Sequence, residues 1–165
     1  MKKALATIIC ALVLQACGIY SFTGTSIDPD VNTISIEYIT NKAQTVNPSL
    51  SNEITEALRT KYKRMTRLEE VETDGDLTVT GSITNYSVSA TAISANEVAA
   101  QNRLTITVQI DFENVKHPEQ NVSQSFSNYA DFDAMTSLAA VESTLCAEIV
   151  EKLVEDIFNA TVAQW

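Results

Sequence analysis

The stretch from Arg103 to Val115 constrains the fold of this chain more than any other. Apolar and polar side chains alternate along it, and its apolar set consists of Leu104, Ile106, Val108, Ile110 and Phe112. A period of two residues places successive side chains on opposite faces of a β-strand. This strand therefore requires an apolar layer on one side, and its opposite side, which carries Thr and Gln, is polar.

Two neighbouring segments have the same period and predict partners for this strand. One runs from Leu77 to about Ile93, and its apolar residues change from odd to even positions on the way. One extra residue in a strand produces such a change, which predicts a bulge near Thr84 to Tyr86. The other runs from Val122 to Phe132, after a polar loop over Lys116–Asn121. With a turn over Ser94–Asn102, the three segments predict an antiparallel meander.

An earlier strand is expected from Asn32 to Thr40, where Ile34, Ile36 and Tyr38 alternate with polar residues. A helix separates it from the meander, so this strand can pair in parallel and make the sheet mixed.

Two amphipathic helices complete the expected fold. The first spans about Pro48 to Leu68, and the second begins at Thr136 or Ser137 and ends near Ala163. Apolar residues recur at intervals of three and four in both. In the first helix they are Leu50, Ile54, Ala57, Leu58, Met65 and Leu68, and in the second they are Leu138, Val141, Leu145, Ile149, Leu153 and Ile157.

The order strand, helix, three strands, helix predicts an α+β fold. We expect a two-layer sandwich in which two helices cover one face of a four-stranded mixed sheet. The uncovered face is rich in Ser, Thr, Asn and Gln, so it is either solvated or in contact with a partner.

The N-terminus has the features of an export signal. Met1-Lys2-Lys3 precedes an apolar run that ends at Leu14-Gln15-Ala16-Cys17. The run is too short to span a bilayer, which takes about 20 residues. Leu, a variable residue, Ala and Cys resemble the bacterial lipobox, whose cysteine becomes acylated after cleavage. The alternative is an ordinary secreted protein in which this cysteine is coincidental.

The chain thus divides into a lipoprotein signal peptide (1–16), a lipid anchor and tether (17–30) and one α/β domain (31–165). Residues 1–16 carry two of the 11 Lys and Arg and none of the 21 Asp and Glu, so the remainder has a formal charge of 9 minus 21, or −12. Such an acidic body argues against binding of nucleic acid, which requires basic surfaces. The acyl chains on Cys17 are the expected membrane attachment.

Most of the remaining basic residues lie in the second half of the first helix. Four of them, Arg59, Lys63, Arg64 and Arg67, are expected on the side away from the apolar stripe. Five acidic residues follow between Glu69 and Asp76. The cluster is therefore either a solvated, partly paired face or a patch that contacts phosphate or carboxylate groups of a ligand.

The sequence has no signal for catalysis, a metal or a cofactor. His117 is the single histidine, and a loop position beside Pro118 is unsuited to a hydrolase triad, although a lipid-tethered hydrolase remains an alternative. Cys and His ligands with metal-site spacing are absent, as are glycine-rich phosphate loops. Cys146 lies in the apolar pattern of the last helix and is expected to be buried.

Several segments resemble the LptE-like outer-membrane lipoproteins, in particular the branch found in Bacteroidota. They are Ile34-Ser35-Ile36-Glu37-Tyr38 with Asn47-Pro48-Ser49-Leu50-Ser51, Ala100-Gln101-Asn102-Arg103-Leu104-Thr105-Ile106-Thr107-Val108, Phe126-Ser127-Asn128-Tyr129-Ala130-Asp131-Phe132 and Val154-Glu155-Asp156-Ile157-Phe158-Asn159. The resemblance covers nearly the whole chain after the signal, but it includes no catalytic signature.

The resemblance implies an outer-membrane lipoprotein of lipopolysaccharide transport and assembly. Such a protein is a small α/β sandwich that plugs the LptD β-barrel, assists its assembly and contacts lipopolysaccharide. The basic residues expected to make that contact here are the helix cluster and Arg103, at the start of a strand. The alternative is an auxiliary adaptor lipoprotein of another envelope transport complex. We expect the domain at the periplasmic face of the outer membrane, anchored by its lipid.

Overall fold

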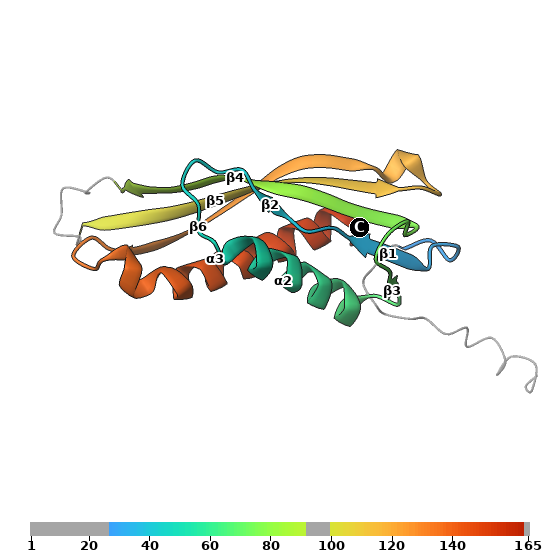
Figure 1. The fold of residues 1–165 in the computed structure, drawn as a ribbon, viewed down its shortest axis with the longest axis horizontal. Coiled ribbons are helices and arrows are strands. Elements are labelled where there is room, and N and C mark those ends of the chain that lie inside the picture. The colour runs from blue at the N-terminus through green and yellow to red at the C-terminus, as the bar shows by residue number, and fades with distance from the viewer. Residues whose placement is uncertain (1–26, 92–99, 164–165) are drawn as a thin grey trace, which may run out of the picture.

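The computed structural model describes residues 27–91 and 100–163, in which two helices pack against one face of a β-sheet (Figure 1). The two-layer α+β architecture and the mixed sheet confirm the expected fold class. The elements are β1 (Thr33–Ile36), β2 (Thr40–Asn41), α2 (Leu50–Met65), β3 (Glu69–Glu70), β4 (Leu77–Ala90), β5 (Gln101–Asn114), the short 3₁₀-helix η2 (Pro118–Gln120), β6 (Val122–Asp133) and α3 (Leu138–Thr161). The signal, Cys17, most of the β4–β5 turn and Trp165 lie outside the described residues.

The sheet has six strands in the order β3-β1-β4-β5-β6, with β2 also paired to β4. As expected, β4, β5 and β6 form an antiparallel meander and β1 runs parallel to β4. The expected count of four strands is wrong. The two additional strands, β2 and β3, have two residues each, which is too short for an alternating pattern to reveal them.

The bulge lies where the sequence predicts it. The register of β4 against β5 shifts between Ile83 and Asn85, so that Thr84 is the extra residue. Ile83 and Tyr86 therefore both face the core, with exposed fractions of 0% and 6%. The change of phase predicts that Val88 also faces inward, but it is 44% exposed.

The first strand is shorter than the alternation suggests. It ends at Ile36, and Tyr38 is exposed rather than buried. Instead Ile39 is fully buried, and its backbone N–H donates to Thr55 Oγ1 of α2 at 3.1 Å. Gly81 makes room for it, because a Cβ there would lie only 3.3 Å from Ile39 Cδ1 and 2.5 Å from Gln109 O. Because the chain bends after Ile36, Ile39 packs into the core in place of the expected Tyr38.

Both helices begin and end within a few residues of the expected positions, and their apolar stripes form the second layer of the core (Figure 1). Met65 is an exception: it is 44% exposed, and Tyr62 occupies the buried position instead. The hydroxyl of Tyr62 lies 2.5 Å from Thr161 Oγ1, and its ring meets Phe158 edge-on at 5.3 Å between centroids. A partner for the hydroxyl is what permits tyrosine at a fully buried site.

Cys146 is buried, as predicted, and burial raises the pKa of its thiol to about 11.

Among residues 27–91 and 100–163, neither helix is long and apolar enough to cross a membrane.

Candidate functional site

The four basic residues of the expected helix cluster do not form one patch, and Arg67 lies beyond α2, which ends at Met65. Arg59 and Lys63 line a groove of about 570 Å³ between α2 and the chain around β3. Arg64 lines a different depression, of about 700 Å³, between α2 and α3. Arg67 reaches back to the segment before β1. Arg59 and Lys63 are four residues apart on α2 and share one side of it, whereas Arg64 lies beside α3.

Arg59 is already engaged by the protein. Its Nη1 lies 2.9 Å from Glu56 Oε1, and its Nη2 donates to the carbonyl oxygen of Ile36 at 3.1 Å. Its Nε forms an ion pair with Glu70 Oε1 at 3.1 Å, although the angle is not that of a hydrogen bond. Acidic residues after the helix thus neutralise this member of the cluster, and Arg59 links α2 to both β1 and β3.

Arg67 also has a structural position. Its Nη2 donates to the carbonyl oxygens of Asp28 at 2.7 Å and Val31 at 3.3 Å. These residues are where the chain enters the folded domain. The side chain therefore fixes the entering segment against the end of α2, and its donors are largely occupied.

Lys63 and Arg64 remain as the cations of the cluster without partners. Both side chains are exposed, and neither forms an ion pair or hydrogen bond with any residue that the structure describes. The depression beside Arg64 is lined by apolar residues of both helices, including Ala57, Val150 and Val154, and its other charged residues are mostly Glu.

Arg103 lies on the other face of the sheet, away from α2. It makes a two-pronged contact with Asp131, with Nε 2.7 Å from Oδ1 and Nη2 2.9 Å from Oδ2. Its guanidinium carbon is 3.6 Å from the centre of the Tyr129 ring. The Asp131 carboxylate raises the pKa of Arg103, and the guanidinium lowers the pKa of Asp131. The structure thus does not bring Arg103 together with the helix cluster.

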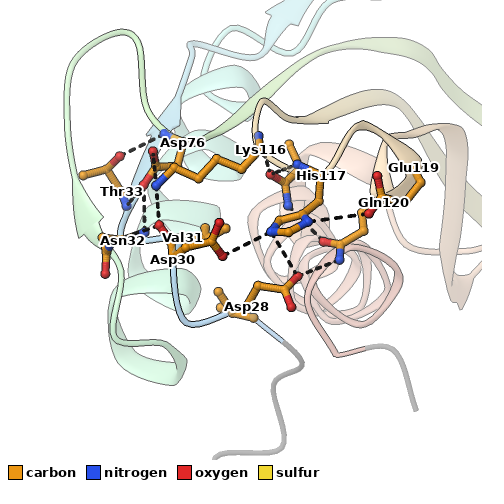
Figure 2. Close-up of polar contacts among 12 residues, drawn as sticks. Asp28, Asp30, Val31, Asn32, Thr33, Asp76, Lys116, His117, Glu119 and Gln120 are labelled. Carbon is orange, nitrogen blue, oxygen red and sulfur yellow. Dashed lines mark hydrogen bonds and ion pairs between the residues drawn. The ribbon is translucent and has the colours of Figure 1, made fainter.

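His117 lies in the β5–β6 loop among carboxylates (Figure 2). Its Nε2 is 3.1 Å from Asp30 Oδ1 and 3.7 Å from Asp28 Oδ2, and its Nδ1 is 3.5 Å from Glu119 Oε1. The hydrogen bond with Asp30 and the nearby acidic groups raise the pKa of His117. All three ring contacts are with carboxylates and none with a hydroxyl or thiol, so the geometry is that of a clamp between two segments and not of a nucleophile and its base.

Asp76 is the centre of the same clamp (Figure 2). Its carboxylate accepts from the backbone N–H groups of Asn32 at 2.8 Å and Thr33 at 3.1 Å, and its Oδ1 lies 3.0 Å from Lys116 Nζ. These contacts, with the Asn32 N–H first, lower the pKa of Asp76 to about 2. In return Asp76 N–H donates to Thr33 Oγ1 at 2.8 Å. Asp76 thus joins the start of β1 to β4 and to the β5–β6 loop.

Sequence reasoning counted Asp76 only among the acidic residues that follow the first helix, and it did not predict these contacts. Asp74 adopts a positive φ of 56°, consistent with a turn. The side-chain contacts of Asp76 span more than 40 positions in sequence, and no local spacing predicts them.

The uncovered face of the sheet carries short polar side chains in rows. Ser127 Oγ lies 3.0 Å from Thr107 Oγ1, and Ser125 Oγ donates to Gln109 Oε1 at 2.5 Å. Ser123 similarly donates to Asp111. Cross-strand pairs of this kind hold the side chains close to the sheet and leave a flat, hydroxyl-rich surface.

No metal centre is evident in the described part of the chain. Within it, no three His, Cys, Asp or Glu side chains are arranged so that they could hold an ion.

Comparison with known proteins places the chain in context. A family model described as "Lipopolysaccharide-assembly" (LptE) matches residues 31–161. No curated protein sequence matches the chain.

Several solved structures share the fold. A minor lipoprotein from Acinetobacter baumannii is 11% identical with a TM-score of 0.50, and the match covers 77% of this chain and 89% of that one. A hypothetical protein from Chlamydia trachomatis is 9% identical with a TM-score of 0.52, covering 77% and 93%. A protein from Xanthomonas campestris is 8% identical with a TM-score of 0.53, covering 81% and 89%. At such low identities the likeness concerns the fold alone.

Proposed function

Because the chain belongs to the LptE family of lipopolysaccharide-assembly proteins, we propose that it is the lipid-anchored plug and assembly partner of an LptD-type β-barrel. The single observation that carries the proposal is the extent of the family match. Residues 31–161 include every helix and strand that the structure describes, so the whole folded domain is of this family.

The uncovered sheet face supports a position inside a barrel. The lumen of an outer-membrane barrel is polar, whereas its apolar side chains face the lipid. A flat surface of Ser, Thr and Gln side chains, held by cross-strand hydrogen bonds, matches a polar wall. The contacts found around His117 and Arg103 are those of structural groups, which agrees with a role in assembly and not in catalysis.

The proposed anchor limits where the domain acts. Cys17 would carry the acyl chains, and thirteen residues, Gly18 to Asp30, connect it to the domain. Fully extended, they span at most ~43–47 Å. The domain therefore works close to the membrane that holds Cys17, which we propose is the periplasmic face of the outer membrane.

For contact with lipopolysaccharide we propose Lys63 and Arg64. Phosphate groups attract exposed cations that have no carboxylate partner. Arg59, Arg67 and Arg103 already bind carboxylate or carbonyl oxygens of the protein itself. Their replacement would therefore disturb the fold and obscure any effect on binding.

Purification from native membranes tests the barrel partnership. We expect a large β-barrel protein, identified by mass spectrometry, to co-purify with the full chain. A Cys17→Ser form should retain part of this association if the barrel itself holds the domain. Co-purification of an inner-membrane ATPase complex without a barrel would instead favour the adaptor function.

Single charge reversals test the lipid contact. Lys63→Glu and Arg64→Glu should each weaken binding to purified lipopolysaccharide several-fold. Lys42→Glu changes the net charge of the chain equally, but at an exposed residue outside the cluster, and should have little effect. If all three variants bind alike, the assignment of Lys63 and Arg64 is wrong.

A further inference from the structure

The strand β6 is the last strand of the sheet (Figure 1). Its register with β5 determines which of its backbone groups face outward. Ala134 N–H donates to Ala100 O at 3.0 Å, in line with the β5–β6 register. Residues of an antiparallel pair alternate between hydrogen-bonded and non-hydrogen-bonded positions. The even residues of β6 therefore bond to β5, and the odd residues direct their N–H and C=O groups away from the sheet.

Those outward groups have almost no partners. The carbonyl oxygen of Tyr129 accepts from Lys152 Nζ at 3.4 Å, which agrees with the outward direction of the odd residues. In the described residues no hydrogen bond satisfies the outward N–H groups. They belong to Ser123, Ser125, Ser127, Tyr129, Asp131 and Asp133.

The edge also lacks the features that usually prevent strands from pairing. Natural edge strands are short, bulged, interrupted by proline or lined with charges. β6 has 12 residues in an unbroken register, with no proline and no Lys or Arg. Its only charged residues, Asp131 and Asp133, are at one end. From Val122 to Ala130 the edge is neutral and regular, as in strands that accept another strand.

The flank of α3 indicates what such a strand would carry. Asn128 on β6 donates to Asp156 Oδ2 at 2.5 Å, which places this flank beneath the edge. With Asn128, a depression of about 440 Å³ there is lined by Glu148, Glu151, Lys152, Glu155 and Asp156. Lys152 pairs with Glu148 at 2.8 Å and Lys61 pairs with Glu155, so the excess of negative charge comes from Glu151 and Asp156.

We propose that β6 is a docking edge for an extended segment of a partner protein with Lys or Arg at every second position. Its main chain would pair with the odd residues of β6. Alternate side chains would then lie over the acidic flank of α3, and the others beside Ser123, Ser125 and Ser127 on the hydroxyl-rich face. This docking edge is a different surface from the proposed lipopolysaccharide contact at Lys63 and Arg64, and binding to it requires no lipopolysaccharide.

Two peptides test the proposal on the full mature protein in detergent. The first is acetylated and amidated Thr-Lys-Thr-Lys-Thr-Lys-Thr, and the second has Glu in place of each Lys. Binding is measured by isothermal titration calorimetry, and exchange of individual amide protons by NMR. The Lys peptide should bind at least tenfold more tightly than the Glu peptide and should slow exchange at Ser125, Ser127 and Tyr129.

Matched variants separate the main-chain contribution from the charges. Ser127→Pro removes one outward N–H and should weaken binding of the Lys peptide at least tenfold, whereas Ser127→Thr keeps the N–H and should not. Glu151→Lys should weaken binding several-fold, and Glu72→Lys, an equal change at an exposed residue outside the α3 flank, should not. The Glu151 variant decides the outcome if Ser127→Pro fails to fold.

Three results would overturn the proposal. One is absence of Lys-peptide binding at millimolar concentration, or equal binding of both peptides. Another is binding that neither Ser127→Pro nor Glu151→Lys weakens. The third is slow exchange of the odd amides before peptide is added, because a second copy or the tether of this chain would then occupy the edge.

Discussion

The two edges of the sheet differ in length and in how they are held. At the β1/β3 edge, a two-residue strand covers a four-residue strand. Arg59 connects both strands to α2, and Asp76 connects the start of β1 to β4 and Lys116. At the opposite edge, β6 is 12 residues long and keeps its outward N–H groups free of partners in the described chain. One edge is closed by side chains, and the other is open along its main chain.

The difference follows from where the chain enters the domain. The tether arrives beside β1, and the contacts of Asp28, Asp30, Asn32 and Thr33 fix it against the β4 turn and the β5–β6 loop (Figure 2). Asp28 and Asp30, where the chain enters the domain, therefore lie at the edge that has the most side-chain cross-links. The β5–β6 loop leads directly into β6, so the entering segment is held close to the start of β6 as well as to β1.

The closed edge should break most readily at Gly75. A Cβ there would lie 2.6 Å from Ser35 N and 2.8 Å from Ile34 C, and both are backbone atoms that cannot move without shifting β1. We expect Gly75→Ala to lower the free energy of unfolding by about 3 kcal/mol, at the upper end of overpacking penalties. Urea denaturation followed by circular dichroism measures it. A loss below about 1 kcal/mol would mean that β1 is not tightly seated on β4.

The open edge is tested by two prolines at adjacent exposed residues. Gln124→Pro should cost about 2–3 kcal/mol, because the N–H of an even residue bonds to β5 and its loss leaves a carbonyl unpaired. Ser125→Pro should cost less than about 1 kcal/mol, because proline is tolerated in an edge strand where the N–H points away from the sheet. Denaturation curves of the two variants compare them directly. Equal losses would show that the outward direction of the odd residues is wrong.

Much of this contrast is absent from the local sequence pattern. Alternation over Arg103–Val115 predicts the central strand, and the change of phase in the preceding segment predicts the bulge that the register shift at Ile83/Asn85 confirms. β2 and β3 escape prediction because two residues cannot show a period. Tyr38 and Met65 have the right spacing for burial, but neither packs into the core, since Ile39 and Tyr62 take the space.

The candidate site is less predictable still. Spacing places Arg59, Lys63 and Arg67 in one row of a helix, but it cannot show that Glu70 and the carbonyl oxygen of Asp28 occupy the two arginines. Likewise Arg103 and Asp131 are 28 positions apart, and only the β5–β6 register brings them together. Free and engaged cations look the same in a sequence, so long-range pairing decides which of them can meet a ligand.

Asp76 gives a smaller and pH-dependent way to open the closed edge. Asp76→Asn keeps the size of the side chain but removes the charge that two backbone N–H groups and Lys116 share, which should cost about 1–2 kcal/mol. The pKa is lowered from 3.8 to about 2 on folding, so the stability that this group confers is present above pH 3.8 and is lost as the pH falls towards 2. Unfolding at pH 7 and pH 3 should show a smaller difference between wild type and variant at the lower pH. Glu72→Gln, at an exposed residue nearby, is the control and should match wild type at both.

His117 should have the smallest effect on the closed edge and the opposite dependence on pH. Its pKa is raised above 6.5 in the folded protein, so the stability that it confers is complete below pH 6.5 and is lost as the pH rises through the folded value. Wild type should therefore be more stable than His117→Ala by a larger margin near pH 6 than at pH 8. The opposite trend would mean that the pairing with Asp30 is unfavourable. Melting temperatures of the two proteins at pH 6 and pH 8 measure this change. Asp30→Asn should reduce the same dependence, because its hydrogen bond is the main cause of the raised pKa, and a dependence that persists in His117→Ala would assign it to another group.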